Sequence, residues 1–215
     1  AWASSPLSLL EVLRKTIDDQ YKVKFVRTQS ERRDQLQPIV DKLLQLDHTA
    51  DEKFMMLCHL LSQFKQDGRK VIVFVELRAT AYYIEEMLNQ VMPEISIANV
   101  VRKKGSEYKQ KHFEKEVLPL IYDFAPEANA EKIKKGHKAK HYDVFVTTDA
   151  YGVGINLQDA SVVISYDLAW TADIIIQRAG RVLRFSKRPV KVFLYVFTGV
   201  FTKNIVKQRA SKSID

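Results

Sequence analysis

Five short apolar runs, separated by segments with helical character, constrain the fold more than any other feature of this sequence. The runs cover residues 70–75, 95–101, 142–147, 162–166 and 192–197. Unbroken apolar runs of this length are typical of strands that are buried on both faces of a sheet. Because the strands alternate with helices, each should return through a crossover and lie parallel to its neighbours. The sequence therefore predicts an α/β fold, with helices on both faces of a parallel sheet.

The first 49 residues depart from this alternation, since they hold helical patterns without a strand between them. A Ser-Ser-Pro sequence at residues 4–6 precedes the amphipathic run 9–17, as expected where a helix begins. A second amphipathic run spans residues 34–46. We therefore expect a helical appendage over residues 1–49 and an α/β domain over residues 50–215.

The net charge of +8 is concentrated in two stretches of the α/β domain. Residues 99–141 contain eleven Lys and Arg against six Asp and Glu, and residues 178–215 contain ten against one. Such clustering is typical of a surface that binds a polyanion, either nucleic acid or nucleotide. A solvated basic face would give the same pattern. We interpret residues 99–141 as a basic excursion within the domain.

Cys58 is the only cysteine, which excludes intramolecular disulfides and cysteine-based zinc sites. It lies within a helix predicted over residues 51–65, so we expect it to be packed in the core. His137 and His141 lie one helical turn apart, but no cysteine or acidic cluster joins them. We therefore expect no metal site.

Apolar residues make up 46% of the chain and charged residues 28%, a balance that is ordinary for a soluble protein. No apolar run approaches the roughly 18 residues that a membrane-spanning helix needs. The N-terminal residues lack the basic and apolar segments of a signal peptide. We expect a cytoplasmic protein without membrane contacts.

Two clusters of polar residues and glycines carry the chemistry. The first, residues 147–156, follows directly on a predicted strand, where open α/β sheets place their ligand-binding loops. In the second, Gln177, Arg181 and Arg184 are spaced four and three residues apart, so a helical run would present them on one face. Arginine suits phosphate because its planar fork can meet two oxygens at once. Arg178 is not one of these three spaced residues, and we interpret it as a surface residue.

These two clusters resemble motifs V and VI of superfamily 2 helicases and translocases, with most similarity to the Swi/Snf-type DNA-dependent ATPases of bacteria. The resemblance implies a RecA-like second lobe. It also implies that Arg181 and Arg184 reach the γ-phosphate of ATP across a cleft, while Gln177 positions water or nucleotide. Arginine fingers of this kind can contribute about 10³ to 10⁵ in rate.

The resemblance assigns further roles in the first cluster. Thr148, with Thr147 as its neighbour, matches the threonine that contacts a nucleic-acid phosphate. Gly152 and Gly154 permit close approach of the backbone to a ligand, and Asn156 corresponds to a residue that couples this loop to the nucleotide. A glycine turn capped by an asparagine would be the purely structural interpretation.

Weaker similarities extend to two loops that follow predicted strands. Arg78, after the strand at residues 70–75, resembles a backbone contact of helicase motif IV. Gly105 and Ser106 resemble a turn that faces a phosphate of the bound strand. Each of these positions fits an exposed loop equally well.

Further details follow from the same resemblance. The phrase Phe-Ala-Pro-Glu-Ala-Asn at residues 124–129 resembles a bacterial Swi/Snf-like subgroup, and the lysines of residues 132–140 would either lie along DNA or be solvated. Trp170 should pack rather than stack on a base, and Thr171 should be an N-cap. The family often has Pro where Ala169 stands, which separates this chain from the usual subgroup pattern.

The sequence contains no Gly-x-x-x-x-Gly-Lys-[Ser/Thr] loop and no Asp-Glu-x-[Asp/His] box. Both belong to the first lobe of the family, which would bind ATP and Mg²⁺. We therefore expect a motor lobe that needs a first RecA-like lobe of the same parent chain, acts on double-stranded DNA, and is inactive alone. An RNA helicase lobe, a lobe that only binds or docks nucleic acid, and a restriction or phage-defence subunit remain alternatives.

Overall fold

A computed structural model of the protein describes residues 4–18, 29–45, 49, 51–101, 113–133, 140–152, 155–183 and 192–197. Several predicted features lie outside the described residues. They are Gly105, Ser106, His137, Gly154 and Arg184.

A parallel sheet of five strands forms the centre of the protein. Its strands are β1 (Val71–Phe74), β2 (Ile97–Asn99), β3 (Val144–Thr147), β4 (Val162–Ser165) and β5 (Phe193–Val196). They are ordered β2-β3-β1-β4-β5, and every neighbouring pair is parallel. The five predicted strands are confirmed, each within its apolar run. Phe74 is paired with both Thr147 and Ser165, so the three central strands end at the same level.

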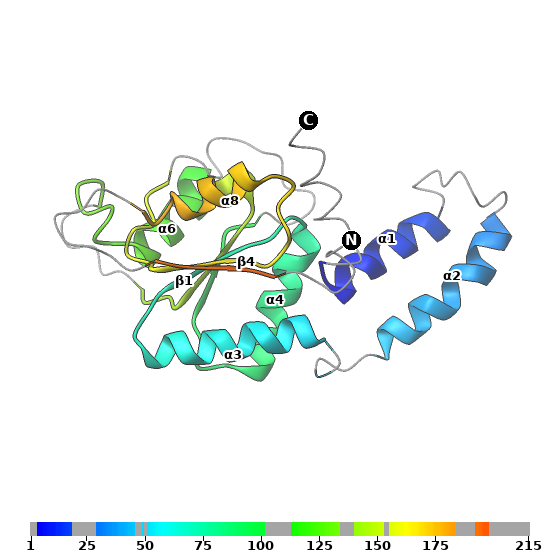
Figure 1. Ribbon diagram of the computed structural model, residues 1–215. Helices are drawn as coiled ribbons and strands as arrows, with labels where there is room; N and C mark the ends of the chain where they lie inside the picture. Colours follow the sequence, from blue (N-terminus) through cyan, green and yellow to red (C-terminus); the bar gives the residue numbers. More distant parts are fainter. Residues whose placement is uncertain are drawn as a thin grey trace, which may run out of the picture.

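Helices cover both faces of this sheet, as predicted (Figure 1). They are α3 (Glu52–Gln66) and α4 (Arg78–Val91) on one face and α6 (Leu118–Phe124) and α8 (Ala172–Ala179) on the other. A π-helical turn η2 (Phe113–Val117) leads into α6, and the short α7 (Asp149–Gly152) follows β3.

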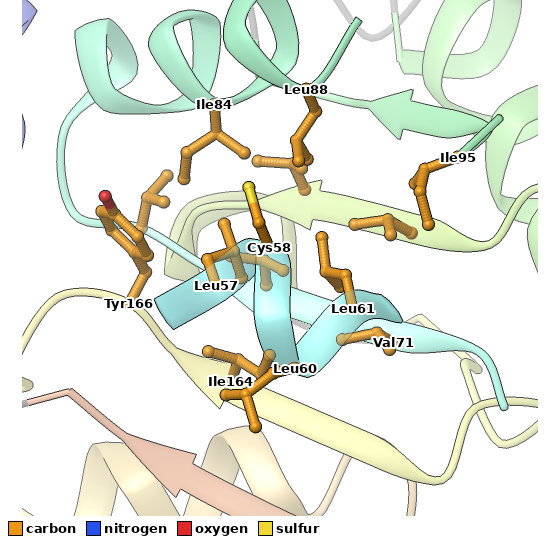
Figure 2. Close-up of a cluster of buried hydrophobic side chains, with 14 of the residues drawn as sticks. Leu57, Cys58, Leu60, Leu61, Val71, Ile84, Leu88, Ile95, Ile164 and Tyr166 are labelled. Carbon is orange, nitrogen blue, oxygen red and sulfur yellow. The ribbon is translucent and has the colours of Figure 1, made fainter. Parts of the chain in front are cut away.

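The core between the sheet and the α3–α4 face is built from aliphatic and aromatic side chains. Leu57 and Leu61 of α3 lie against Ile84 and Leu88 of α4, with strand residues beneath them (Figure 2). Cys58 is buried in this cluster, as predicted, and burial raises the pKa of its thiol to about 11. The thiol is therefore neutral near pH 7 and poorly nucleophilic.

The opposite face of the sheet has a second core. It joins α6, the loop after α7 and the end of the α8 region through Ile121, Phe124, Leu157 and Val182, all of which are buried. The rings of Phe124 and Phe145 lie 5.0 Å apart. Three segments that are distant in sequence therefore share one apolar cluster.

The predicted N-terminal helices are α1 (Pro6–Ile17) and α2 (Gln29–Leu44). Ser5 and Ser8 form a capping box at the start of α1. The two helices pack on each other through Leu10, Ile17 and Val40. The division of the chain near residue 49 remains a proposal.

The amino-terminal edge of the sheet is held by Asp143, just before β3. Its carboxylate accepts hydrogen bonds from Lys65 Nζ at 2.8 Å and from the backbone and hydroxyl of Ser96 at 2.8 and 2.9 Å. His141 Nε2 lies 2.9 Å from the other carboxylate oxygen. Burial alone would raise the pKa of Asp143, but these hydrogen bonds outweigh it and hold the pKa below its usual value.

Neither a membrane-spanning helix nor a metal-binding cluster is found within the described ranges. None of the helices there has both the length and the apolar character that crossing a bilayer requires. The same residues contain no group of three or more His, Cys, Asp or Glu side chains arranged to hold a metal ion.

Candidate functional site

The candidate site lies where the three central strands end. Phe74, Thr147 and Ser165 are the last residues of β1, β3 and β4, and they lie side by side in the register of the sheet. The chain leaves the sheet here into the loops that hold Asp149 and Asp167. Open α/β sheets bind their ligands at this edge.

Arg178 is the centre of this edge, and its interpretation as a surface residue is wrong. The residue is only 3% exposed. Its guanidinium donates to both carboxylate oxygens of Asp149, at 2.8 and 2.7 Å, and to Ser165 Oγ at 3.0 Å. It also lies over the ring of Phe74, 5.2 Å from the centroid. A buried arginine is tolerated here because its planar fork is paired and hydrogen-bonded.

The Asp149 to Arg178 pair joins the two clusters that the sequence singled out. Asp149 begins α7, directly after β3, and Arg178 lies in the last turn of α8. The face of α8 that carries Arg178 is turned to the sheet. The start of α7 and the last turn of α8 are therefore joined by one bidentate ion pair.

Unlike Arg178, the predicted phosphate-binding residues Gln177 and Arg181 are not buried. Gln177 is exposed and Arg181 is partly exposed. The continuous helix expected through Arg181 is not found, because α8 ends at Ala179. The chain continues in tight turns, in which Arg181 N donates to Arg178 O at 3.1 Å and Leu183 N to Ala179 O at 3.1 Å. Gln177 and Arg181 are thus both accessible to a ligand.

Thr147 and Thr148 differ sharply in exposure. Thr147 is fully buried and its hydroxyl donates to the carbonyl of Thr148 at 3.1 Å. Because it is enclosed, the Thr147 hydroxyl is not available to an external phosphate in this structure. Thr148 is partly exposed, so the predicted nucleic-acid contact is accessible only there.

The loop after α7 contains Asn156, which is partly buried. Its carbonyl accepts a hydrogen bond from Asn129 Nδ2 at 2.9 Å, and its own amide lies 3.5 Å from the carbonyl of Ala128. Asn156 therefore faces the turn that follows α6. Gly152 is the last residue of α7. The nucleotide contact expected for Asn156 stays a prediction.

Asp167 connects further segments at the same edge. Its carboxylate accepts from Ser4 Oγ at 2.8 Å, from Lys53 Nζ at 3.0 Å and from Glu76 N at 2.7 Å, and it is only 4% exposed. Burial lowers the pKa of Lys53, and the charge of Asp167 opposes that shift. The main-chain oxygen of Asp167 also accepts from Arg178 at 3.3 Å. Sequence reasoning missed this residue, since its four partners lie far apart in the chain.

The flanking residues fit their predictions only in part. Arg78 is exposed at the start of α4, as a nucleic-acid contact requires. Trp170 does not pack as expected, because it is 63% exposed and its indole N–H donates to Glu76. Thr171 is the N-cap of α8, although its side chain makes no capping hydrogen bond.

Comparison with known sequences places these features in a family. Residues 52–186 match the family described as "Helicase conserved C-terminal domain". YqhH of Bacillus subtilis, an uncharacterized ATP-dependent helicase, is 28% identical over 180 residues, which cover 83% of this chain and 26% of YqhH. ATP-dependent RNA helicase SUB2 of Pyricularia oryzae is 25% identical over 85% of this chain and 40% of its own length. Human SWI/SNF-related matrix-associated actin-dependent regulator of chromatin subfamily A member 1 is 25% identical over 77% of this chain and 15% of its own.

Solved structures agree on the fold. The C-terminal part of the Fun30 ATPase domain superposes with a TM-score of 0.52 at 17% identity, covering 96% of this chain and 65% of that one. The Pyrococcus furiosus Hef helicase domain gives 0.53 at 19% identity, covering 95% and 38%. These likenesses confirm the predicted RecA-like architecture.

The chain spans less than half the length of the curated relatives named above. The family match, by contrast, extends over more than half of the chain and includes every described residue of both motif clusters. The protein therefore belongs to the helicase conserved C-terminal domain family, as a second, RecA-like lobe of the superfamily 2 helicase and translocase type.

Proposed function

We propose that this chain is the second motor lobe of an ATP-dependent DNA translocase, and that it works in the bacterial cytosol or nucleoid. The observation that carries the proposal is the ion pair between the buried Arg178 and the more exposed Asp149. It holds motifs V and VI together at the carboxyl edge of the sheet and leaves Gln177 and Arg181 accessible. That arrangement suits a surface that closes on a phosphate held by a partner lobe.

Arg181 and Arg184 would supply positive charge to the γ-phosphate of ATP during hydrolysis. A guanidinium remains charged at all physiological pH values and can bind two phosphate oxygens. The partial exposure of Arg181 supports this role. Gln177 would orient the attacking water or the nucleotide, as its exposure next to Arg181 permits.

The nucleic-acid track would run along the loops that leave β1, β2 and β3. Thr148 and Arg78 would contact phosphates, which grips the backbone without reading sequence. Gly105 and Ser106 would add backbone N–H donors, and Gly152, Gly154 and Asn156 would connect this track to the nucleotide. The two basic stretches of the sequence would strengthen binding in a salt-dependent way.

The chain would not hydrolyse ATP alone. The sequence has arginines and an amide for phosphate, but no glycine-lysine loop that would cradle the nucleotide and no acidic box for Mg²⁺. Mg²⁺ neutralises phosphate charge when bound, and its ligands would come from the first lobe. A first RecA-like lobe of the same parent chain is therefore the partner that the proposal requires.

The test is ATP hydrolysis by a longer protein that includes upstream coding sequence, with and without duplex DNA. We expect DNA to stimulate hydrolysis and Arg184→Ala to lower the rate by about 10³-fold or more. Arg14→Ala is the matched control, because Arg14 is exposed on α1, away from the motif loops. Hydrolysis that is absent, or indifferent to Arg184→Ala, would make this a lobe that only binds or docks nucleic acid.

An RNA helicase lobe is the second candidate. It is favoured by the similarity to SUB2, which extends over 85% of this chain. Single-stranded RNA in place of duplex DNA distinguishes the two, since only the cognate nucleic acid should stimulate hydrolysis.

A further inference from the structure

We propose that Asn129 is a positioning residue for the loop formed by residues 155–159, and that the turn at residues 125–129 acts as the outer wall of motif V. This inference rests on the proposed motor function. It assigns a mechanical role to the Phe-Ala-Pro-Glu-Ala-Asn phrase, whose resemblance to one subgroup carries no function of its own.

The side chain of Asn129 bridges two segments of the chain. It is only 3% exposed. Both of its hydrogen bonds come from Nδ2, one to Ala125 O at 2.8 Å and one to Asn156 O at 2.9 Å. A side-chain amide nitrogen has two N–H groups, and Asn129 Nδ2 donates one to its own turn and the other to the motif V loop.

The loop returns hydrogen bonds to the same turn. The carboxylate of Asp159 accepts from the backbone N–H groups of Glu127 at 2.9 Å and Ala128 at 2.7 Å. The amide of Asn156 adds a longer contact to Ala128 O at 3.5 Å. Donors and acceptors on each segment are therefore matched by partners on the other.

Apolar packing makes this connection rigid. Ala125 of the turn and Ile155 and Leu157 of the loop are buried in one cluster. Val182, the residue after Arg181, belongs to that cluster as well. A shift of the turn would therefore disturb the motif V loop and the backbone beside Arg181 together, because close-packed interiors transmit displacement.

The geometry distinguishes positioning from ligand binding. Asn129 is enclosed and donates only to main-chain carbonyls, so it cannot itself touch nucleotide or nucleic acid. It fixes where Asn156 lies, and with it the path of the chain through residues 155–159. Catalytic groups tolerate little displacement, since a misplacement of about 1 Å can cost 10²-fold in rate.

Two substitutions separate these effects. Asn129→Ala removes both donors and the side-chain volume. Asn129→Asp keeps the shape but turns carboxylate oxygens toward two carbonyl oxygens, so it should be at least as damaging. Ile84→Val is the control, because Ile84 is fully buried in the core on the other face of the sheet and its loss of one methylene lowers stability without touching the loop.

The first measurement is backbone hydrogen exchange on the 215-residue chain. We expect Asn129→Ala and Asn129→Asp to accelerate exchange over residues 155–160 by about ten-fold or more, which local opening produces. Ile84→Val should leave that segment unchanged. Unchanged exchange in both Asn129 variants would overturn the proposal, since the turn would not hold the loop.

The second measurement is ATP hydrolysis by the longer protein at a temperature where all variants are folded. We expect the Asn129 variants to lower nucleic-acid-stimulated kcat by about ten-fold, a typical effect of misplaced catalytic geometry, and Ile84→Val to stay within about two-fold of wild type. Faster exchange with unchanged kcat would overturn the positioning role. If the wild type shows no stimulated hydrolysis, the motor function itself fails and the positioning role with it, while exchange still reports whether the turn holds the loop.

Discussion

A lysine–aspartate ion pair lies at the amino-terminal end of the strands and another at their carboxyl-terminal end, which we call the amino edge and the carboxyl edge, but the two pairs have different roles. Helix α3 contributes a lysine to each edge, Lys53 near its start and Lys65 near its end. Each lysine donates to a shielded aspartate, Lys53 to Asp167 at 3.0 Å and Lys65 to Asp143 at 2.8 Å. A charge that is removed from water in this way must be paired and hydrogen-bonded, and both aspartates meet that requirement.

The partners of the two aspartates differ. Asp143 binds Ser96 and His141, which flank the starts of β2 and β3, so its network closes the sheet locally. Asp167 binds Ser4 at one end of the described chain and, through its main-chain oxygen, Arg178 of motif VI. The Asp143 network at the amino edge thus stabilises the sheet locally, whereas the Asp167 network at the carboxyl edge connects the N-terminal segment to the candidate site.

The largest expected effect lies at the carboxyl edge, at Arg178. We expect Arg178→Ala to lower the free energy of unfolding by about 3 kcal/mol, the lower end of the range for breaking a buried ion pair, because Asp149 is 48% exposed and can be solvated. Urea unfolding of the 215-residue chain measures this. Arg178→Lys should recover part of the loss, since it keeps the charge without the fork. A loss in unfolding free energy below about 1 kcal/mol, which is the range of surface ion pairs, would show that Arg178 does not hold the carboxyl edge together.

The second effect separates the two edges directly. Asp167→Asn replaces one acceptor by a donor, and we expect it to cost about 2 kcal/mol because hydrogen bonds to charged groups are lost. It should also accelerate hydrogen exchange in α1, whereas Asp143→Asn should not. Asp34→Asn, on the exposed surface of α2, is the control and should stay within about 0.5 kcal/mol. Equal exchange in α1 for both edge variants would break the contrast.

The smallest effect at neutral pH concerns acid sensitivity at the amino edge. The folded-state pKa of Asp143 is lowered, so its charge stabilises the fold above the unfolded pKa of about 4, and that stabilisation is lost as the pH falls through the lower folded value. We expect the difference in unfolding free energy between wild type and Asp143→Asn to shrink as the pH falls below about 4. Urea unfolding as a function of pH checks it. A difference that persists undiminished at about pH 3 would show that Asp143 contributes by shape alone.

The strands were predictable because the signal for them is local. Each apolar run contains its strand, and the burial of all four residues of β1, β3 and β4 follows from parallel pairing between helical layers. The start of α1 was equally local, since a Ser-Ser-Pro sequence marks it. Periodicity and capping need only neighbouring residues, so these predictions did not depend on tertiary contacts.

The site was less predictable because its central contacts join distant residues. Arg178 is not one of the spaced residues Gln177, Arg181 and Arg184, which is why the sequence suggested a surface residue. In a short helix that packs on a sheet, however, the residue next to an exposed one is rotated by about 100° and can lie on the inner face. Asp149, 29 residues earlier, makes burial possible. The available signal was an acidic residue directly after a strand, with an arginine on the inward face of the following motif helix.

The hydrogen bonds that hold Ser4 in place would also fix the position of any domain attached upstream of it. Ser4 Oγ is fixed to Asp167 and to Thr80, and Lys53 holds the carbonyl of Ser4 at 3.2 Å. A preceding domain would therefore be tethered beside the carboxyl edge rather than at the far end of the α1 and α2 pair. Short tethers of this kind give effective concentrations of about millimolar, so a domain attached there would meet this end of the sheet often even if its affinity for the sheet were weak.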